Sequence, residues 1–432
     1  MADLLRFATA GSVDDGKSTL IGRLLYDSKT VFADQLAAVE QTSADRGDDY
    51  TNLALLTDGL RAEREQGITI DVAYRYFSTP ARSFIVADTP GHVQYTRNMV
   101  TGASTADLAL VLVDARKGVV EQTRRHASLS ALLRVPHLVL AVNKMDLVEF
   151  DESVFDRIVG EFAAFARELH LELPDVTAIP VAALHGDNVV HRSAQMPWYD
   201  GPALLEHLEG VEVERDHVGR RGARFPVQYV IRPMSTERPD YRGYAGTVAT
   251  GTLRVGDQVL ALPSGRRTTV AGIDTFDGPL LSAVARQAVT VRLADELDVS
   301  RGDMLVAVDD PPQLLSVLEA TVCWMADTPL RAGARVLVKH TTRSAKAMVT
   351  AVRDRWDVTT LGHEPAGALV LNDIGRITLR TATPLAVDAY TADRSTGAFI
   401  LVDEATGATV GAGMVASPDA VTGSTSTPVA GL

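Results

Sequence analysis

The stretch Gly11-Ser12-Val13-Asp14-Asp15-Gly16-Lys17-Ser18 decides the fold of the N-terminal part of the chain, because it matches the phosphate-loop pattern G-x-x-x-x-G-K-[ST]. It follows the apolar run Leu4–Ala10 and precedes a helical pattern that starts near Lys17. Glycines let backbone N–H groups wrap phosphate, a lysine reaches the terminal phosphates, and a serine hydroxyl can hold Mg²⁺. We therefore expect a strand, a phosphate loop and a helix, with the residues from Gly11 to Thr19 around a nucleotide.

The sequence around this loop predicts an α/β domain. Longer helical patterns separate three further β-prone runs: Ser83–Ala87, Leu108–Val113 and Leu138–Val142. This alternation is typical of βαβ units, so residues 1–211 are predicted to form a P-loop domain with a mostly parallel sheet and helices on both faces. Asp88 and Asn143 directly follow two of the runs. Because ligands bind at the carboxyl ends of strands in such sheets, we expect both residues near the phosphate loop.

A second motif, Asp88-Thr89-Pro90-Gly91-His92, supplies an acidic residue for the Mg²⁺ site. In sites of this class the aspartate usually acts on the metal through a water molecule, and the Gly91 backbone N–H can contact the γ-phosphate. Taken alone the motif is weak. Asp88 could equally be a helix or turn cap, and His92 an ordinary surface or core histidine.

A third motif, Asn143-Lys144-Met145-Asp146, indicates guanine. The Asn143 amide can donate and accept at the base edge, the aliphatic part of Lys144 can lie along the ring, and the Asp146 carboxylate can accept from N1–H and N2–H. Adenine offers no such pair of donors, so the motif favours GTP over ATP. Val181-Ala182-Ala183-Leu184 follows a further predicted strand, and there the Ala183 backbone N–H is expected to contact guanine O6.

Length and composition limit the possible functions. The chain has 432 residues with 42 Lys and Arg against 55 Asp and Glu, a formal net charge of −13. This acidic balance disfavours nucleic acid as a partner, because proteins that neutralise phosphates carry a basic excess. No apolar stretch has a membrane-spanning length, and the N-terminus lacks a signal-peptide pattern. The single cysteine, Cys323, cannot form an internal disulfide, and we expect a cytoplasmic protein.

The C-terminal half has a different pattern. Glu212–Arg224 is charged and carries two glycines, so it is predicted to be a linker. Beyond it, short β-prone runs such as Gly246–Ala249 alternate with Gly, Pro and Asp, a pattern typical of β-barrels. We predict the remaining domains as a barrel over 225–311, a second barrel over 314–415, and a flexible tail over 416–432.

Taken in order, with Arg64-Glu65-Gln66-Gly67-Ile68-Thr69-Ile70 between the first two, these motifs resemble those of the translational GTPases, the relatives of elongation factors Tu and 1-alpha. The resemblance covers the whole chain and implies a GTPase domain followed by two β-barrels. It also implies that Thr69 coordinates Mg²⁺ and that His92 orients the attacking water behind Val13 and Ile68. In these proteins a serine usually stands where this chain has Ala182.

Within that superfamily the chain looks most like the family of large, GTPase subunits of bacterial sulfate adenylyltransferases. Asp15 stands where elongation factors usually have histidine, and the stretches Leu25–Asp27, Gln94–Asn98 and Arg224–Pro233 fit this branch. The resemblance implies a GTPase that uses Mg²⁺ and drives the synthesis of adenylylsulfate and pyrophosphate from ATP and sulfate. A separate, smaller subunit would bind ATP and catalyse the transfer, in a heterodimer or a larger assembly.

Some alternatives stay open. A translation elongation factor that binds aminoacyl-tRNA would share most of the motifs, although Asp15 and the acidic charge disfavour it. Some members of the branch carry a fused adenylylsulfate kinase, but the phosphate-loop pattern occurs only once in this sequence, so we expect that activity to be absent. An arginine that assists hydrolysis could be Arg64, Arg97 or a residue of the partner.

Overall fold

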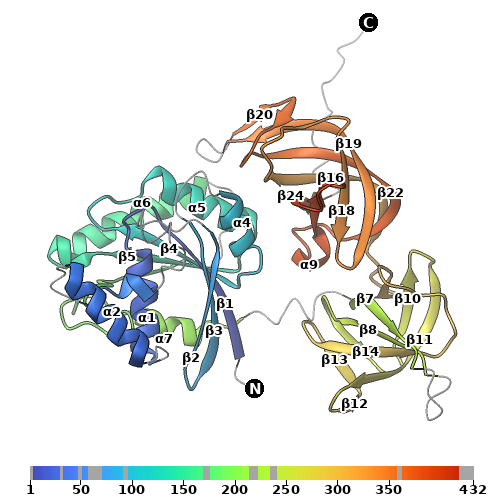
Figure 1. Ribbon diagram of the computed structural model, residues 1–432, viewed down its shortest axis with the longest axis horizontal. Coiled ribbons are helices and arrows are strands. Elements are labelled where there is room, and N and C mark those ends of the chain that lie inside the picture. The colour runs from blue at the N-terminus through green and yellow to red at the C-terminus, as the bar shows by residue number, and fades with distance from the viewer. Residues whose placement is uncertain are drawn as a thin grey trace, which may run out of the picture. The chain divides into compact units, whose positions relative to one another are not determined.

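The chain is divided into two compact units, an N-terminal unit that ends at Val213 and a C-terminal unit that follows it (Figure 1). The structure is a computed structural model that describes residues 3–29, 33–46, 51–56, 71–90, 96–168, 176–213, 222–233, 241–357 and 362–417. Within these ranges no helix is long and apolar enough to cross a membrane. Each unit is described by itself below.

The N-terminal unit is built on a 6-stranded sheet. In spatial order its strands are β2 (Ala73–Ser78), β3 (Arg82–Asp88), β1 (Asp3–Ala10), β4 (Leu108–Asp114), β5 (His137–Asn143) and β6 (Val176–Pro180). All neighbouring pairs are parallel except β2 with β3, which form an antiparallel pair at one edge. The prediction of a mostly parallel α/β sheet is therefore confirmed.

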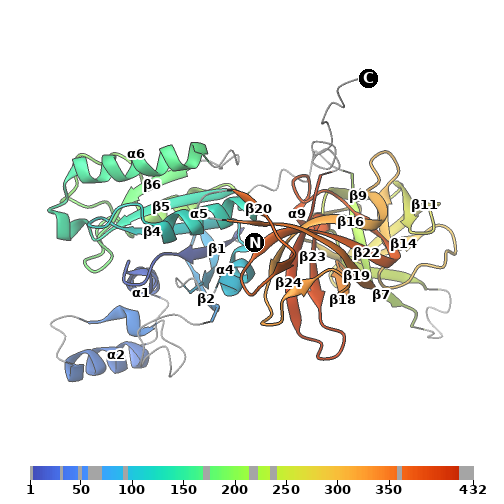
Figure 2. The ribbon, with the colours of Figure 1, turned by 90° about the horizontal axis from the view of Figure 1, so that it is seen from above.

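Helices cover both faces of the sheet because its central strands are apolar on both sides (Figure 2). In β4, Leu108, Leu110 and Leu112 pack with α1 (Lys17–Asp27) and α7 (Leu204–Gly210). The intervening Val111 and Val113 pack on the other face with α5 (Glu121–Leu132) and α6 (Glu152–Glu168). The described unit also contains α2 (Ala33–Arg46), α4 (Thr96–Ala103) and the short 3₁₀ helices η1 (Leu53–Leu56) and η3 (Met145–Val148).

The C-terminal unit begins with a closed barrel of antiparallel strands. Pairing of β10 with β11 closes the sheet, which contains β7 (Arg224–Ile231), β8 (Gly243–Thr247), β10 (Gln258–Leu262), β11 (Arg266–Thr275), β12 (Gly278–Leu280), β14 (Ala288–Leu293) and β15 (Met304–Ala307). A separate pair is formed by β9 (Thr252–Arg254) and β13 (Ser282–Val284). The run predicted over Gly246–Ala249 lies three residues earlier, as β8, because Gly243–Thr247 is the segment that pairs with β14 and β7.

A second closed barrel follows, and pairing of β18 with β19 closes it. Its strands are β16 (Gln313–Trp324), β18 (Arg335–His340), β19 (Arg343–Trp356), β20 (His363–Pro365), β22 (Ile374–Val387), β23 (Ala398–Val402) and β24 (Thr409–Val415). The short strands β17 (Leu330–Arg331) and β21 (Ala368–Leu369) pair with each other, and α9 (Arg394–Gly397) precedes β23. The two barrels have separate apolar cores, one with Phe225 and Val291 and one with Val338 and Leu379.

Arg224 joins the two barrels. The segment Glu212–Arg224 was expected to be a linker, but β7 already begins at Arg224, whose side chain is completely buried. Its guanidinium donates to both carboxylate oxygens of Asp388 in the second barrel, at 3.0 and 3.1 Å. Thr396 donates a further hydrogen bond to the Asp388 carboxylate at 2.6 Å. The charged residue that ended the expected linker is therefore an interior contact between the barrels.

Arg224→Ala is expected to lower the free energy of unfolding of the C-terminal unit by about 3–5 kcal/mol, because it leaves the Asp388 carboxylate buried and without its cation. Arg343→Ala is the matched control. Arg343 also joins the two barrels, through Asp303 at 3.2 Å, but both side chains are partly exposed, so a loss of about 1 kcal/mol or less is expected. Urea denaturation of both variants measures the difference, and equal losses would contradict the assignment.

Candidate functional site

The phosphate loop lies between β1 and α1 as predicted, and two of its residues have a left-handed backbone. Asp14 has a φ of 70° and Gly16 a φ of 91°, so the chain turns sharply before it enters the helix at Lys17. Lys17 Nζ forms an ion pair with the Asp88 carboxylate, and both side chains are buried. Thr89 also donates to the Thr9 carbonyl oxygen at 2.7 Å, which fixes β1 to the end of β3. The first two motifs therefore meet at one edge of the sheet.

Asp15, which distinguished this chain from elongation factors, is an internal support of the loop. Its side chain is buried, and its carboxylate accepts a hydrogen bond of 2.7 Å from the Ser12 backbone N–H. Lys117 Nζ lies 3.9 Å from the same carboxylate. Burial raises the pKa of Asp15 to about 6, against the opposing effects of the Ser12 hydrogen bond and the Lys117 charge.

Asn143 ties the phosphate loop to the loop that follows β6. Its side-chain Nδ2 donates to the Asp15 carbonyl oxygen at 2.8 Å, and its Oδ1 accepts from the Ala183 backbone N–H at 3.0 Å. Both functional atoms of the amide are thus used inside the protein. The Ala183 N–H, which was expected to reach guanine O6, donates to Asn143 in this structure.

Lys144 is held by residues that the sequence motifs did not include. Its Nζ lies 3.0 Å from Asp114 Oδ2 and also donates to the Asp14 carbonyl oxygen. Arg116 donates to the Asp114 carboxylate at 2.6 and 3.0 Å. Burial alone would raise the pKa of Asp114, but the hydrogen bonds from Arg116 and Lys144 outweigh it and hold that pKa well below its usual range. Asp114 is the last residue of β4, so its place at this edge of the sheet was the signal that could have found it.

The Asp146 carboxylate lies beside the loop that follows β6. His185 Nε2 is 3.7 Å from Asp146 Oδ2, and the Asp146 side chain is mostly buried. Ala182 and Ala183 are buried, while Leu184 is partly exposed. The structure therefore brings together the residues predicted for the base, namely Asn143, Lys144, Asp146, Ala182, Ala183 and Leu184.

Several predicted residues cannot be placed. Thr69, Gly91 and His92 lie outside the described residues, as do Ile68 and Arg64. Val13 and Arg97 are described, and both side chains are exposed.

Comparison with known proteins agrees with this geometry. Residues 2–288 match the family described as "Elongation factor Tu GTP binding domain", and residues 317–416 match "GTP-eEF1A C-terminal domain-like". The chain is 53% identical to a "Sulfate adenylyltransferase subunit 1" from Laribacter hongkongensis over 96% of this chain and 86% of that protein. The corresponding protein of Aeromonas salmonicida is 52% identical over 95% and 86% of the two chains.

The chain belongs to the sulfate adenylyltransferase subunit 1 family. It is also 60% identical to the "Bifunctional enzyme CysN/CysC" of Mycobacterium tuberculosis, over 96% of this chain and 67% of that protein. Family membership confirms the resemblance drawn from the motifs, and it supports GTP as the nucleotide and an enzyme subunit as the class of protein.

The oxygen atoms at this site fit Mg²⁺, a hard cation that prefers carboxylate, hydroxyl and phosphate oxygens. Asp88 supplies a buried carboxylate. Ser18 supplies a hydroxyl directly after Lys17, and its side chain is partly exposed. Among the described residues no group of three or more His, Cys, Asp and Glu side chains could hold a metal alone.

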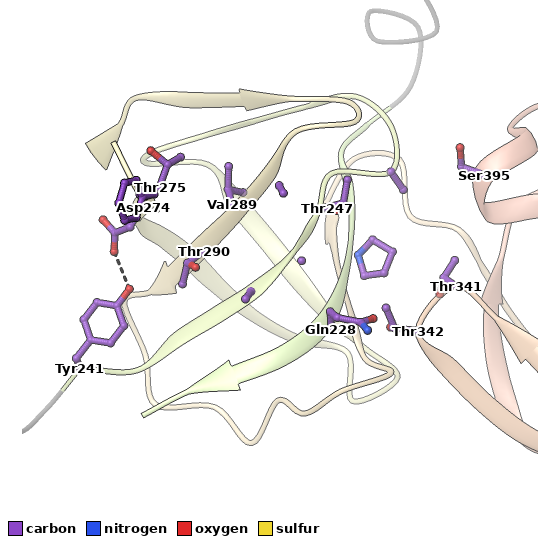
Figure 3. A pocket seen from close by; sticks show the side chains of 16 residues that line it. Gln228, Tyr241, Thr247, Asp274, Thr275, Val289, Thr290, Thr341, Thr342 and Ser395 are labelled. Carbon is purple, nitrogen blue, oxygen red and sulfur yellow. Dashed lines mark hydrogen bonds between the residues drawn. The ribbon is translucent and has the colours of Figure 1, made fainter. Parts of the chain in front are cut away.

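A pocket lies in the C-terminal unit and does not involve the predicted nucleotide residues (Figure 3). It is lined by residues of both barrels, among them Gln228, Thr247, Thr341 and Ser395. At its far side Tyr241 donates to the Asp274 carboxylate at 2.9 Å. The lining combines hydroxyl groups with the Gln228 amide, the Asp274 carboxylate and apolar groups that include Phe276.

Gly16→Ala is expected to weaken GTP binding by at least roughly tenfold, since a non-glycine residue with a left-handed backbone costs about 1–2 kcal/mol. In addition, a Cβ at this position would lie 2.4 Å from Asn143 Nδ2 and would displace the amide that joins the two loops. Isothermal titration with GTP measures the loss. Gly160→Ala in α6 is the control, because a Cβ there meets nothing within 4 Å. Unchanged GTP affinity in Gly16→Ala would contradict a role of this glycine in GTP binding.

Asp15 also gives a pH-dependent prediction. A carboxyl group with a raised folded-state pKa contributes stability below about pH 3.8 and loses it as the pH rises through about 6. Asp15→Asn cannot ionise, so its melting temperature relative to wild type should increase between pH 4.5 and pH 7.5. Asp200→Asn, at a fully exposed side chain, should show no such trend. A melting-temperature difference between Asp15→Asn and wild type that does not change with pH would contradict the raised pKa of Asp15.

Proposed function

We propose that this chain binds and hydrolyses GTP with Mg²⁺ and uses that hydrolysis to drive adenylylsulfate synthesis by a separate catalytic subunit. The observation that carries the proposal is the meeting of Lys17, Asp88 and the Asn143–Asp146 loop at one edge of the sheet. The subunit 1 relatives supply the reaction, since their name is that of an enzyme that transfers an adenylyl group to sulfate.

The protein's own residues would divide the work between base and phosphates. Asp146 would accept from guanine N1–H and N2–H, and the aliphatic part of Lys144 would lie along the ring. Because Lys144 Nζ is held by Asp114 and the phosphate loop, its chain needs no reordering when the base arrives. The backbone N–H groups of Gly11–Thr19 and the Lys17 ammonium would stabilise the charge on the phosphates.

Mg²⁺ would be held by the Ser18 hydroxyl, by Asp88 through water and, in agreement with the resemblance, by Thr69; it would neutralise charge on the phosphate oxygens. The Lys17–Asp88 ion pair implies that Lys17 exchanges one anionic partner for another when a triphosphate binds. His92 would orient the attacking water, and an assisting arginine would be Arg64, Arg97 or a residue of the partner.

Coupling follows from the energetics of the proposed reaction. The mixed anhydride of adenylylsulfate is high in energy and sulfate is a poor nucleophile, so synthesis from ATP is strongly uphill. If the GTP state of this chain stabilises the active state of the catalytic subunit, that active state must equally favour the GTP state, since binding linkage is reciprocal. A heterodimer or larger assembly is therefore part of the proposal. The net charge of −13 agrees better with a protein partner than with tRNA.

The test combines the purified chain with its catalytic subunit, ATP and sulfate, and measures adenylylsulfate with GTP or xanthosine triphosphate (XTP). Wild type should respond to GTP alone. Asp146→Asn replaces an acceptor by an amide that can donate to the 2-oxo group of xanthine, so this variant should respond to XTP and lose most of its response to GTP.

A wild type that responds to GTP and a variant that responds to XTP would together show that nucleotide bound at this loop drives the synthesis. Wild type without any GTP response would contradict the coupling, and protection of aminoacyl-tRNA from hydrolysis would then favour a translation factor. An Asp146→Asn variant that kept its GTP affinity would remove Asp146 from the site.

A further inference from the structure

The loop from Ala182 to Asp187 uses nearly all of its polar backbone groups internally. The Ala182 carbonyl oxygen accepts from the N–H groups of His185, Gly186 and Asp187, at 3.1, 2.8 and 3.2 Å. The Ala183 N–H donates to Asn143. Such saturation fixes the loop as a rigid turn.

Arg23 holds the opposite side of the same loop. Its Nη2 donates to the Leu184 carbonyl oxygen at 2.5 Å, and its Nε donates to the Ala183 carbonyl oxygen at 3.3 Å. Arg23 lies on α1, the helix that begins at Lys17, and Asp27 one turn later lies 3.6 Å from its guanidinium. The arginine therefore ties the helix of the phosphate loop to this turn, just as Asn143 ties the phosphate loop itself to it.

One peptide group in the turn has a hydrogen-bonded carbonyl and an N–H without an acceptor. In the part of the chain that the structure describes, the Leu184 N–H has no acceptor, although the carbonyl of the same peptide group, that of Ala183, accepts from Arg23. In a planar trans peptide the C=O and the N–H point in opposite directions. By holding the carbonyl on its own side, Arg23 turns the Leu184 N–H to the side away from α1.

We propose that Arg23 is a positioning residue for base specificity, which orients the Ala183–Leu184 peptide so that the Leu184 N–H donates to the 6-oxo group of guanine. The inference rests on guanine-nucleotide binding at this loop. A 6-oxo group accepts this hydrogen bond, whereas the 6-amino group of adenine presents a second donor to it. Arg23 and Asp146 thus control different edges of the base, the 6-position and the N1–N2 edge.

The test compares the dissociation constants of GTP, 6-thio-GTP and inosine triphosphate (ITP) for wild type, Arg23→Ala and Arg23→Lys. 6-Thio-GTP changes only the 6-position acceptor, while ITP lacks only the 2-amino group. Wild type should prefer GTP over both analogues. In Arg23→Ala, GTP affinity should fall roughly tenfold, the expected size of one lost and well-oriented hydrogen bond. The ratio of the dissociation constants of 6-thio-GTP and GTP should approach one. The ratio of the dissociation constants of ITP and GTP should stay unchanged.

Arg23→Lys can still donate to one carbonyl and should recover part of the preference over 6-thio-GTP. Arg157→Ala removes an exposed arginine on α6 and should match wild type. A merely structural loss in Arg23→Ala would weaken all three nucleotides equally, and unchanged ratios would overturn the inference. Wild type that does not bind GTP would instead refute the guanine site itself. A failed synthesis assay with the expected ratios would refute only the coupling.

Discussion

The site depends on the Asn143 side chain, whose two amide atoms bond the phosphate loop and the loop that follows β6. In the proposed site, phosphate and base would be bound by separate segments of the chain. Two hydrogen bonds, to the Asp15 carbonyl and from the Ala183 N–H, set the spacing between them. Gly16 has to be a glycine in part because this amide fills the space beside it. The fold supplies the convergence, since β1, β3, β4 and β5 all end at this edge.

Much of this arrangement was predictable from the sequence, and for a physical reason. Strands buried on both faces appear as continuous apolar runs, so β1, β3, β4 and β5 were found with errors of about one residue at their ends. The chemistry-bearing residues follow these runs directly. The predicted roles of Thr69, Gly91 and His92 stay predictions, because these residues lie outside the described residues.

The supporting residues could not be predicted in the same way. Arg23 acts through a contact with Leu184, which lies far along the sequence, and no local pattern marks such a pair. At Arg224 the prediction was wrong in another way, because a residue placed in a linker is buried at the start of β7. A charged residue in a polar segment suggested a linker, and only the position of Asp388 shows that burial of this arginine is compensated. Local sequence patterns therefore indicated the residues that the structure gathers at this edge better than the residues that hold them in place.

The buried Arg224–Asp388 pair also has a mechanical consequence. The two barrels have separate cores, but rotation of one barrel against the other would separate or expose the charges of this buried bidentate contact. The contact therefore opposes relative rotation of the two barrels.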